Sequence, residues 1–143
     1  MIVRSIGRSL HRRPWRLAAE AAATLAVASL RVRLVPFSRL VRSAARPLPT
    51  VPAAPEVDRL RRVTEAVASR MPFRAKCLEQ ALALRSMLRR RGIASVLHYG
   101  IRNDGSGLSA HAWLTIGGKI VIGGSSAAQF AEVASFGDGA AGA

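Results

Sequence analysis

Residues 77–116 read CLEQALALRSMLRRRGIASVLHYGIRNDGSGLSAHAWLTI, and inside this stretch the spacing of apolar residues changes from helical to strand-like. From Cys77 onward, apolar residues recur at steps of three and four, which predicts a helix. Gly92 lies where a left-handed residue would end that helix. We expect the polar side of this helix to point outward and to carry three arginines, Arg85, Arg89 and Arg90.

Beyond Gly92 the sequence predicts strands and tight turns. IASVLHYGI (93–101) and LSAHAWLTI (108–116) have strand-like patterns and flank a turn at RNDGSG (102–107). GGK (117–119) predicts a hairpin turn into IVI (120–122). Helices followed by an antiparallel meander predict an α+β fold.

The part of the chain before Cys77 predicts two more helices and a linker. A helical pattern runs from Pro14 to about Val35 and ends at Pro36, and another runs from about residue 55 to 70. ARPLPTVPAAP (45–55) has four prolines and predicts an extended linker.

We therefore divide the 143 residues into four parts. Residues 1–47 form a basic helical N-terminal arm, and residues 48–55 form a proline-rich linker. Residues 56–136 form the folded domain. Residues 137–143 are expected to be a disordered tail because they offer little to pack.

The charge is strongly positive, with 22 basic against 8 acidic residues. Ten arginines and a single acid, Glu20, lie in residues 1–47, so this segment suits an anionic partner such as phospholipid headgroups, nucleic acid or an acidic peptide. Specific nucleic-acid binding is disfavoured, because few aromatic residues are available for stacking on bases.

LAAEAAATLAVASL (17–30) follows a basic stretch, as the core of a signal peptide would. It has 14 residues and contains Glu20, whereas a membrane span needs about 20 apolar residues. The sequence favours an amphipathic helix that packs on the domain or lies on a membrane surface.

Cys77 is the only cysteine, which suits a reducing compartment. It can be an inert core residue or a nucleophile activated by its place at a helix start and by Lys76 beside it. A base would come from His11, His98 or His111. One cysteine and three scattered histidines lack the spacing of metal ligands, so we expect no metal and no cofactor.

The block PFRAKCLEQALALRSMLRRRGIASVLHYGIRNDGSGLSAHAWLTIGGKIVIGG (72–124) resembles the McjB-like leader peptidases of lasso peptide biosynthesis, the B2 proteins. The likeness lies in a Cys-Leu pair opening an Ala/Leu helix, a basic-Gly helix end and an AHAW strand before a Gly-Lys hairpin. It implies a transglutaminase-like (papain-like) cysteine protease core. Cys77 would be its nucleophile and His111 its general base.

The chain departs from that family at the third member of the triad. The family has an aspartate about a dozen residues after the histidine, but residues 119–129 contain no acid, and neither Asp104 nor Glu132 matches the position. Either a backbone carbonyl or one of three side chains holds the imidazole, or the site is weakened; the three side chains are those of Ser125, Ser126 and Gln129.

The resemblance also implies an activity and partners. The enzyme would cleave the leader from a lasso peptide precursor, so that a separate asparagine-synthetase-like cyclase can macrocyclise the core. A small winged-helix recognition protein would present the leader. The expected location is the cytoplasm, with the basic arm touching a partner or the inner face of the membrane. The alternative is a non-catalytic scaffold of the same complex with a degenerate site.

Overall fold

The computed structural model describes residues 14–40, 54–71, 76–103 and 105–137. The helices in these residues are α1 (Pro14–Leu34), α2 (Phe37–Leu40), α3 (Ala54–Ala68), α4 (Cys77–Arg90) and α5 (Gly124–Ala127). The strands are β1 (Val96–Asn103), β2 (Leu108–Ile116), β3 (Lys119–Ile122) and β4 (Ala131–Gly137).

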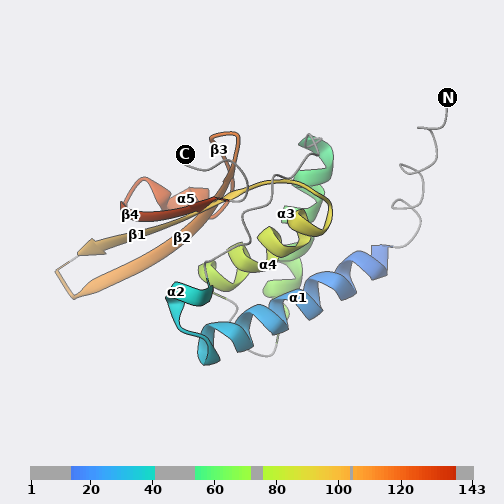
Figure 1. The fold of residues 1–143 in the computed structure, drawn as a ribbon, viewed down its shortest axis with the longest axis horizontal. Coiled ribbons are helices and arrows are strands. Elements are labelled where there is room, and N and C mark those ends of the chain that lie inside the picture. The colour runs from blue at the N-terminus through green and yellow to red at the C-terminus, as the bar shows by residue number, and fades with distance from the viewer. Residues whose placement is uncertain (1–13, 41–53, 72–75, 104, 138–143) are drawn as a thin grey trace.

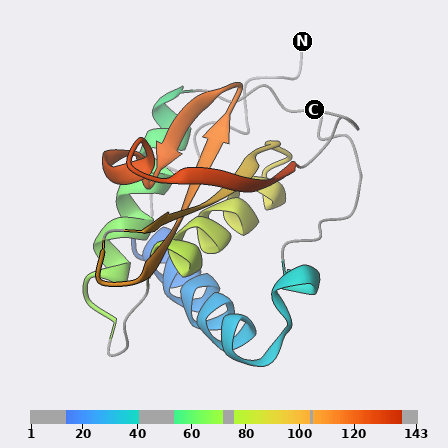
Figure 2. The same cartoon turned by 90° about the vertical axis from the view of Figure 1, so that its left-hand side faces the viewer.

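The helices and strands are arranged in layers (Figures 1 and 2). α3 and α4 contact one face of the sheet, and α1 packs on α3 and α4. The fold is therefore α+β, with three helices packed on a small four-stranded antiparallel sheet, as the sequence predicted.

The sheet has the order β3-β2-β1-β4, with each pair of neighbours antiparallel. β2 has the predicted bounds, and the hairpin into β3 turns at Gly117 and Gly118 with φ of 56° and 81°, which suits a two-residue turn. β1 begins later than predicted, because the N–H of Ile93 still bonds the Leu88 carbonyl at the end of α4. Gly92, with φ of 73°, ends α4 as expected.

The pairing of β4 with β1 was not predicted. Most of the side chains of β4 are exposed, so its sequence has little of the apolar alternation that marks a half-buried strand. The expectation that the tail starts at residue 137 is wrong at that residue, because Gly137 pairs with Val96 of β1. Residues 138–143 lie outside the described residues.

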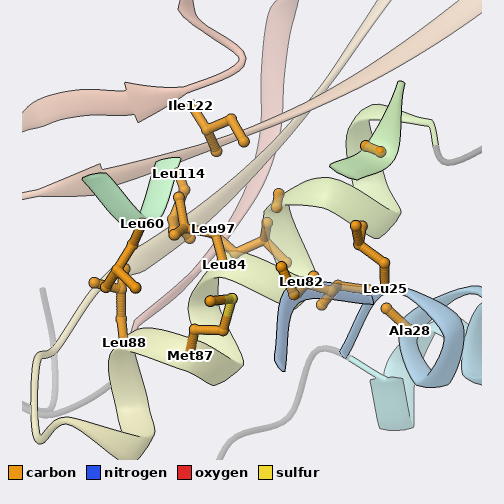
Figure 3. Close-up of a cluster of buried hydrophobic side chains, with 14 of the residues drawn as sticks. Leu25, Ala28, Leu60, Leu82, Leu84, Met87, Leu88, Leu97, Leu114 and Ile122 are labelled. Carbon is orange, nitrogen blue, oxygen red and sulfur yellow. The ribbon is translucent and has the colours of Figure 1, made fainter. Parts of the chain in front are cut away.

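The hydrophobic core joins the helices to the sheet (Figure 3). α4 runs through its middle, and Leu84, Met87 and Leu88 have no exposed surface. They pack with apolar side chains from every neighbouring element, which include Leu25 and Ala28 of α1, Leu60 of α3, Leu97 of β1, Leu114 of β2 and Ile122 of β3.

α1 shares this core. Ala21 and Leu25 have no exposed surface, and Ala28 is buried as well. Of the two placements that the sequence favoured for this helix, the structure therefore has packing on the domain. No helix in the described parts of the chain is both long and apolar enough to cross a membrane. Of the predicted linker, residues 48–55, the part from 48 to 53 lies outside the described residues, whereas Ala54 and Pro55 belong to the first turn of α3 and not to a linker.

Glu20 joins α1 to the end of α4. Its carboxylate accepts hydrogen bonds from both terminal nitrogens of Arg91, at 2.8 and 2.9 Å, and from Nε of Arg90 at 3.1 Å. Arg90 also donates to the hydroxyl of Thr24 at 2.8 Å. The only acid in the first 47 residues therefore pairs with the basic end of α4.

The expectation that Arg85 points outward is wrong. Only 4% of its surface is exposed, because it lies with Ser86 and Arg89 on the side of α4 that faces α1. The sequence predicted an apolar side and an outward polar side for α4, whereas α1 covers part of that polar side.

Candidate active site

Cys77 is the first residue of α4 and is partly buried. Lys76 precedes it in an extended conformation, and the Lys76 side chain makes no capping hydrogen bond. The first intrahelical bond runs from the N–H of Gln80 to the Lys76 carbonyl, so the amide groups of the first turn have no acceptor within the helix. These N–H groups and the positive end of the helix dipole suit a negative charge that develops on a substrate oxygen beside Cys77.

Cys77 and His111 line the same pocket, which has a volume of about 630 Å³. His111 belongs to β2, on the sheet face that it shares with Trp113. The remaining walls come from α3 and from β3 with the residues after it. The sequence-predicted nucleophile and base are thus brought to one cavity at the edge of the sheet where β3 ends.

The imidazole of His111 is anchored by the backbone. Its Nε2 lies 2.7 Å from the carbonyl oxygen of Gly123. A carbonyl only accepts hydrogen bonds, so Nε2 carries the proton and Nδ1 of the neutral ring keeps its lone pair. The ring is also held between Trp113, at 6.0 Å between centroids, and Phe130, at 5.1 Å. Its orientation therefore does not depend on a carboxylate.

Gly123 is the twelfth residue after His111, the distance at which the resembling family has its aspartate. Its φ is +80°, and a Cβ built there would lie 2.7 Å from the Ala112 carbonyl oxygen and 3.0 Å from the Trp113 Cβ. Only glycine fits this position without displacing its neighbours. One of the predicted alternatives, a backbone carbonyl that holds the imidazole, is the arrangement observed.

The other proposed partners of the imidazole have different roles or are not described. The side-chain oxygen of Gln129 accepts a hydrogen bond from Arg102, and Glu132 pairs with His98. Asp104 and the side chains of Ser125 and Ser126 lie outside the described part of the chain.

His98 is not in the pocket. Its ring stacks on Trp113 at 5.5 Å, its Nε2 lies 2.8 Å from the hydroxyl of Thr115, and its Nδ1 is paired with Glu132. His98 therefore ties β4 to β1 and β2. His11 lies outside the described residues, and within those residues no group of three or more metal-ligating side chains occurs.

Sequence reasoning missed the charged wall that α3 gives to the pocket. Arg61 and Glu65 line it, and Arg61 donates to Glu65 at 2.9 Å and to Asp58 at 2.5 Å. These residues lie on the polar side of α3 with i, i+3 and i, i+4 spacing, which signals helix-surface pairing but not a pocket. Gln80, one turn after Cys77, also lines the pocket.

A cysteine at the start of a core helix, a histidine on an adjoining antiparallel sheet and a shared pocket are features of papain-like and transglutaminase-like proteins. The profile of the transglutaminase-like superfamily matches residues 6–135, and the chain belongs to this superfamily. The superfamily includes cysteine peptidases. A search of curated proteins and a search of solved structures found no match.

The matched residues include the whole of α1. This agrees with the packing, in which α1 supplies core residues such as Leu25.

Proposed function

We propose that this protein is a cysteine peptidase in which Cys77 is the nucleophile and His111 the general base. The observation that supports this most is that the residues Cys77 and His111 line one pocket while Nε2 of His111 is engaged by Gly123. This bond leaves Nδ1 as the ring nitrogen able to exchange a proton.

The reaction would proceed through a thioester. The Cys77 thiol transfers its proton to His111, and the sulfur attacks the scissile carbonyl carbon. The C–N bond breaks, and the leaving amine takes the proton from His111. Water then attacks the thioester and gives a proton to His111, which returns it to the departing sulfur, and the acyl fragment leaves as a carboxylic acid. The first-turn amides of α4 are suited to stabilise the oxyanion.

We further propose that the substrate is the precursor of a lasso peptide, from which the enzyme removes the leader. The support is the resemblance of residues 72–124 to the McjB-like leader peptidases, together with membership of a superfamily that includes cysteine peptidases. A small winged-helix protein would present the leader, and an asparagine-synthetase-like cyclase would receive the core.

The test is reconstitution. The purified protein, the recognition protein and the precursor are incubated together, and mass spectrometry follows the release of leader and core. We expect cleavage by the parent and by His98→Gln, and none by Cys77→Ala or His111→Gln. Cleavage by Cys77→Ala at the parent's rate would disprove the assignment.

A second candidate is a scaffold with a degenerate site. It is favoured by one observation: among the described residues, the hydrogen-bond partner of His111 is the Gly123 carbonyl and not a carboxylate. A scaffold would support product formation in cells equally well with Cys77→Ser, whereas a peptidase would not. The scaffold would be preferred over the peptidase if cells that express the Cys77→Ser variant made as much mature peptide as cells that express the parent.

A further inference from the structure

The outer side of α1 is apolar although it faces solvent. Of the eight large hydrophobic side chains that are exposed in the described residues, four lie on this helix, with exposed fractions of 55–71%. They are Trp15, Val27, Leu30 and Leu34. Ala19, Ala23 and Ala26 are also exposed, and we call these seven residues the outer stripe.

The outer stripe is one continuous surface. At about 100° per residue, its members fall within about one third of the helix circumference. The opposite side of α1 is the side that carries Ala21 and Leu25 into the core. α1 is thus apolar on two sides. Only the side with Leu25 and Ala28 packs into the core (Figure 3).

The charges around the outer stripe are positive. Arg16 is exposed near its start, and Arg31 and Arg33 are exposed near its end. Arg39 of α2 is exposed as well. Between Arg16 and Arg31 none of the exposed residues of α1 is charged. Cations at both ends of an apolar face, with a tryptophan at one end, form the pattern of a helix that lies in the interface of an anionic bilayer.

A cationic pocket borders the outer stripe. It has a volume of about 450 Å³, lies between α1 and α4, and shares Ala23 and Val27 with the stripe. Its lining includes four arginines and one acid, Glu20, and this acid is already bonded to Arg90 and Arg91. The four are Arg31, Arg85, Arg89 and Arg90. The four guanidinium groups outnumber the single carboxylate, so the net charge of this lining is positive and favours a lipid phosphate at its mouth.

We propose that the outer stripe and the pocket beside it bind the surface of an anionic phospholipid bilayer. The apolar side chains enter the acyl boundary, and the exposed guanidinium groups of Arg16, Arg31 and Arg33 meet the phosphates. The cations lie at both ends of the outer stripe and in the adjoining pocket. Such a spread of positive charge matches an extended anionic surface, such as a bilayer, better than a protein partner. None of the residues lining the pocket of Cys77 belongs to α1, so this docking leaves that pocket open.

The test uses the full-length protein and vesicles of phosphatidylcholine with or without phosphatidylglycerol. We expect co-sedimentation with the anionic vesicles alone, which weakens as salt rises. The emission of Trp15 shifts to the blue on binding, while Trp113, 7% exposed, already sits in a dry environment. No binding, or equal binding to neutral vesicles, would overturn the proposal.

Matched variants separate this surface from simple charge attraction. Leu30→Ser with Leu34→Ser should weaken vesicle binding by at least about tenfold, because two apolar side chains no longer enter the bilayer. Leu108→Ser is the control, since Leu108 is 74% exposed on β2. Arg31→Gln with Arg33→Gln should weaken binding and reduce its salt dependence, whereas Arg62→Gln, on α3, should not.

Two outcomes would contradict the proposal. If the leucine pair has no effect while the arginine pair abolishes binding, the attraction is only electrostatic. If the parent forms a dimer that the leucine pair disrupts and does not bind vesicles, the outer stripe is a protein interface instead. Circular dichroism checks that each variant is folded.

Discussion

Nε2 of His111 donates a hydrogen bond to the carbonyl oxygen of Gly123, 2.7 Å away. An ionised carboxylate in that place would both orient the ring and stabilise its protonated form. A neutral carbonyl orients the ring but offers less to the imidazolium. The site is therefore arranged to fix the tautomer of His111, with weaker support for its charge.

Gly123→Ala tests this anchor. The added Cβ would meet the Ala112 carbonyl at 2.7 Å, so the chain must shift and the Gly123 carbonyl must move away from the imidazole. We expect a fall in peptidase activity of about tenfold or more, since proton transfer depends on a well-oriented base. Activity is measured by cleavage of the precursor in the presence of the recognition protein.

Gly118→Ala is a closely matched control. Gly118 has a φ of +81°, against +80° for Gly123, but a Cβ there would meet nothing within 4 Å. Both variants place a Cβ on a residue with nearly the same positive φ, and only Gly123→Ala crowds Ala112 and Trp113. Equal losses of activity in the two variants would show that strain, and not the position of the carbonyl, is responsible.

Cys77 should react with iodoacetamide in a way that depends on His111. If the imidazole takes the thiol proton, His111→Gln lowers the alkylation rate at neutral pH by about tenfold, because only the thiolate reacts. His98→Gln should keep the parent's rate, since His98 lies outside the pocket and bonds Thr115. The rate is followed by mass spectrometry of the intact chain.

Equal alkylation rates in the parent and in His111→Gln would mean that the histidine does not act on the sulfur. That result would favour the scaffold over the peptidase.

The sequence predicted the centre of the fold better than its edges. Cys77 at the start of α4, Gly92 at its end and the β2–β3 hairpin were all foreseen, because helix periodicity, a glycine cap and a Gly-Gly turn are local signals. β4 was missed, since its pairing with β1 depends on a partner more than 25 residues away in the chain. Arg85 was misplaced because its burial depends on α1.

The candidate site likewise contains residues that the sequence pointed to and one that it did not. Residue type and spacing made Cys77 a candidate nucleophile and left His11, His98 and His111 as candidate bases, and the family resemblance then pointed to His111. The role of Gly123 could not be predicted in this way, because a backbone carbonyl is present at every residue and only the path of the chain decides where it points. The pair of glycines at 123 and 124, after a short strand, was the one local sign of an unusual backbone at that place.

Leu25→Ala tests whether α1 is part of the core. Leu25 has no exposed surface, so we expect a loss of about 2–4 kcal/mol in the free energy of unfolding. Leu30→Ala, on the outer side of the same helix and 57% exposed, should cost less than about 0.5 kcal/mol. Urea denaturation followed by circular dichroism gives both values, and a loss for Leu25→Ala as small as that for Leu30→Ala would mean that α1 is a detachable arm.

Glu20 should make the stability of the fold depend on pH. The hydrogen bond from Arg91, and the positive charge of Arg91 and Arg90, hold the pKa of Glu20 below its ordinary value of 4.5, although partial burial acts against them. Because the pKa is lower in the folded state, the ionised carboxylate stabilises the fold above pH 4.5. This contribution is lost as the pH falls through the folded-state pKa.

Glu20→Gln should therefore lower the free energy of unfolding at pH 7 by about 1–2 kcal/mol, since Arg91 loses its charged partner in a partly buried place. The difference between the parent and the variant should shrink as the pH drops below 4.5 and nearly vanish once Glu20 is protonated. The midpoints of urea denaturation at several pH values measure this difference in stability. Asp58→Asn is the control, because Asp58 pairs with Arg61 and Arg62 on the surface of α3, where solvent screens the charges. A difference between Glu20→Gln and the parent that stays constant from pH 7 to strongly acidic pH would show that the ion pair with Arg91 does not tie α1 to α4.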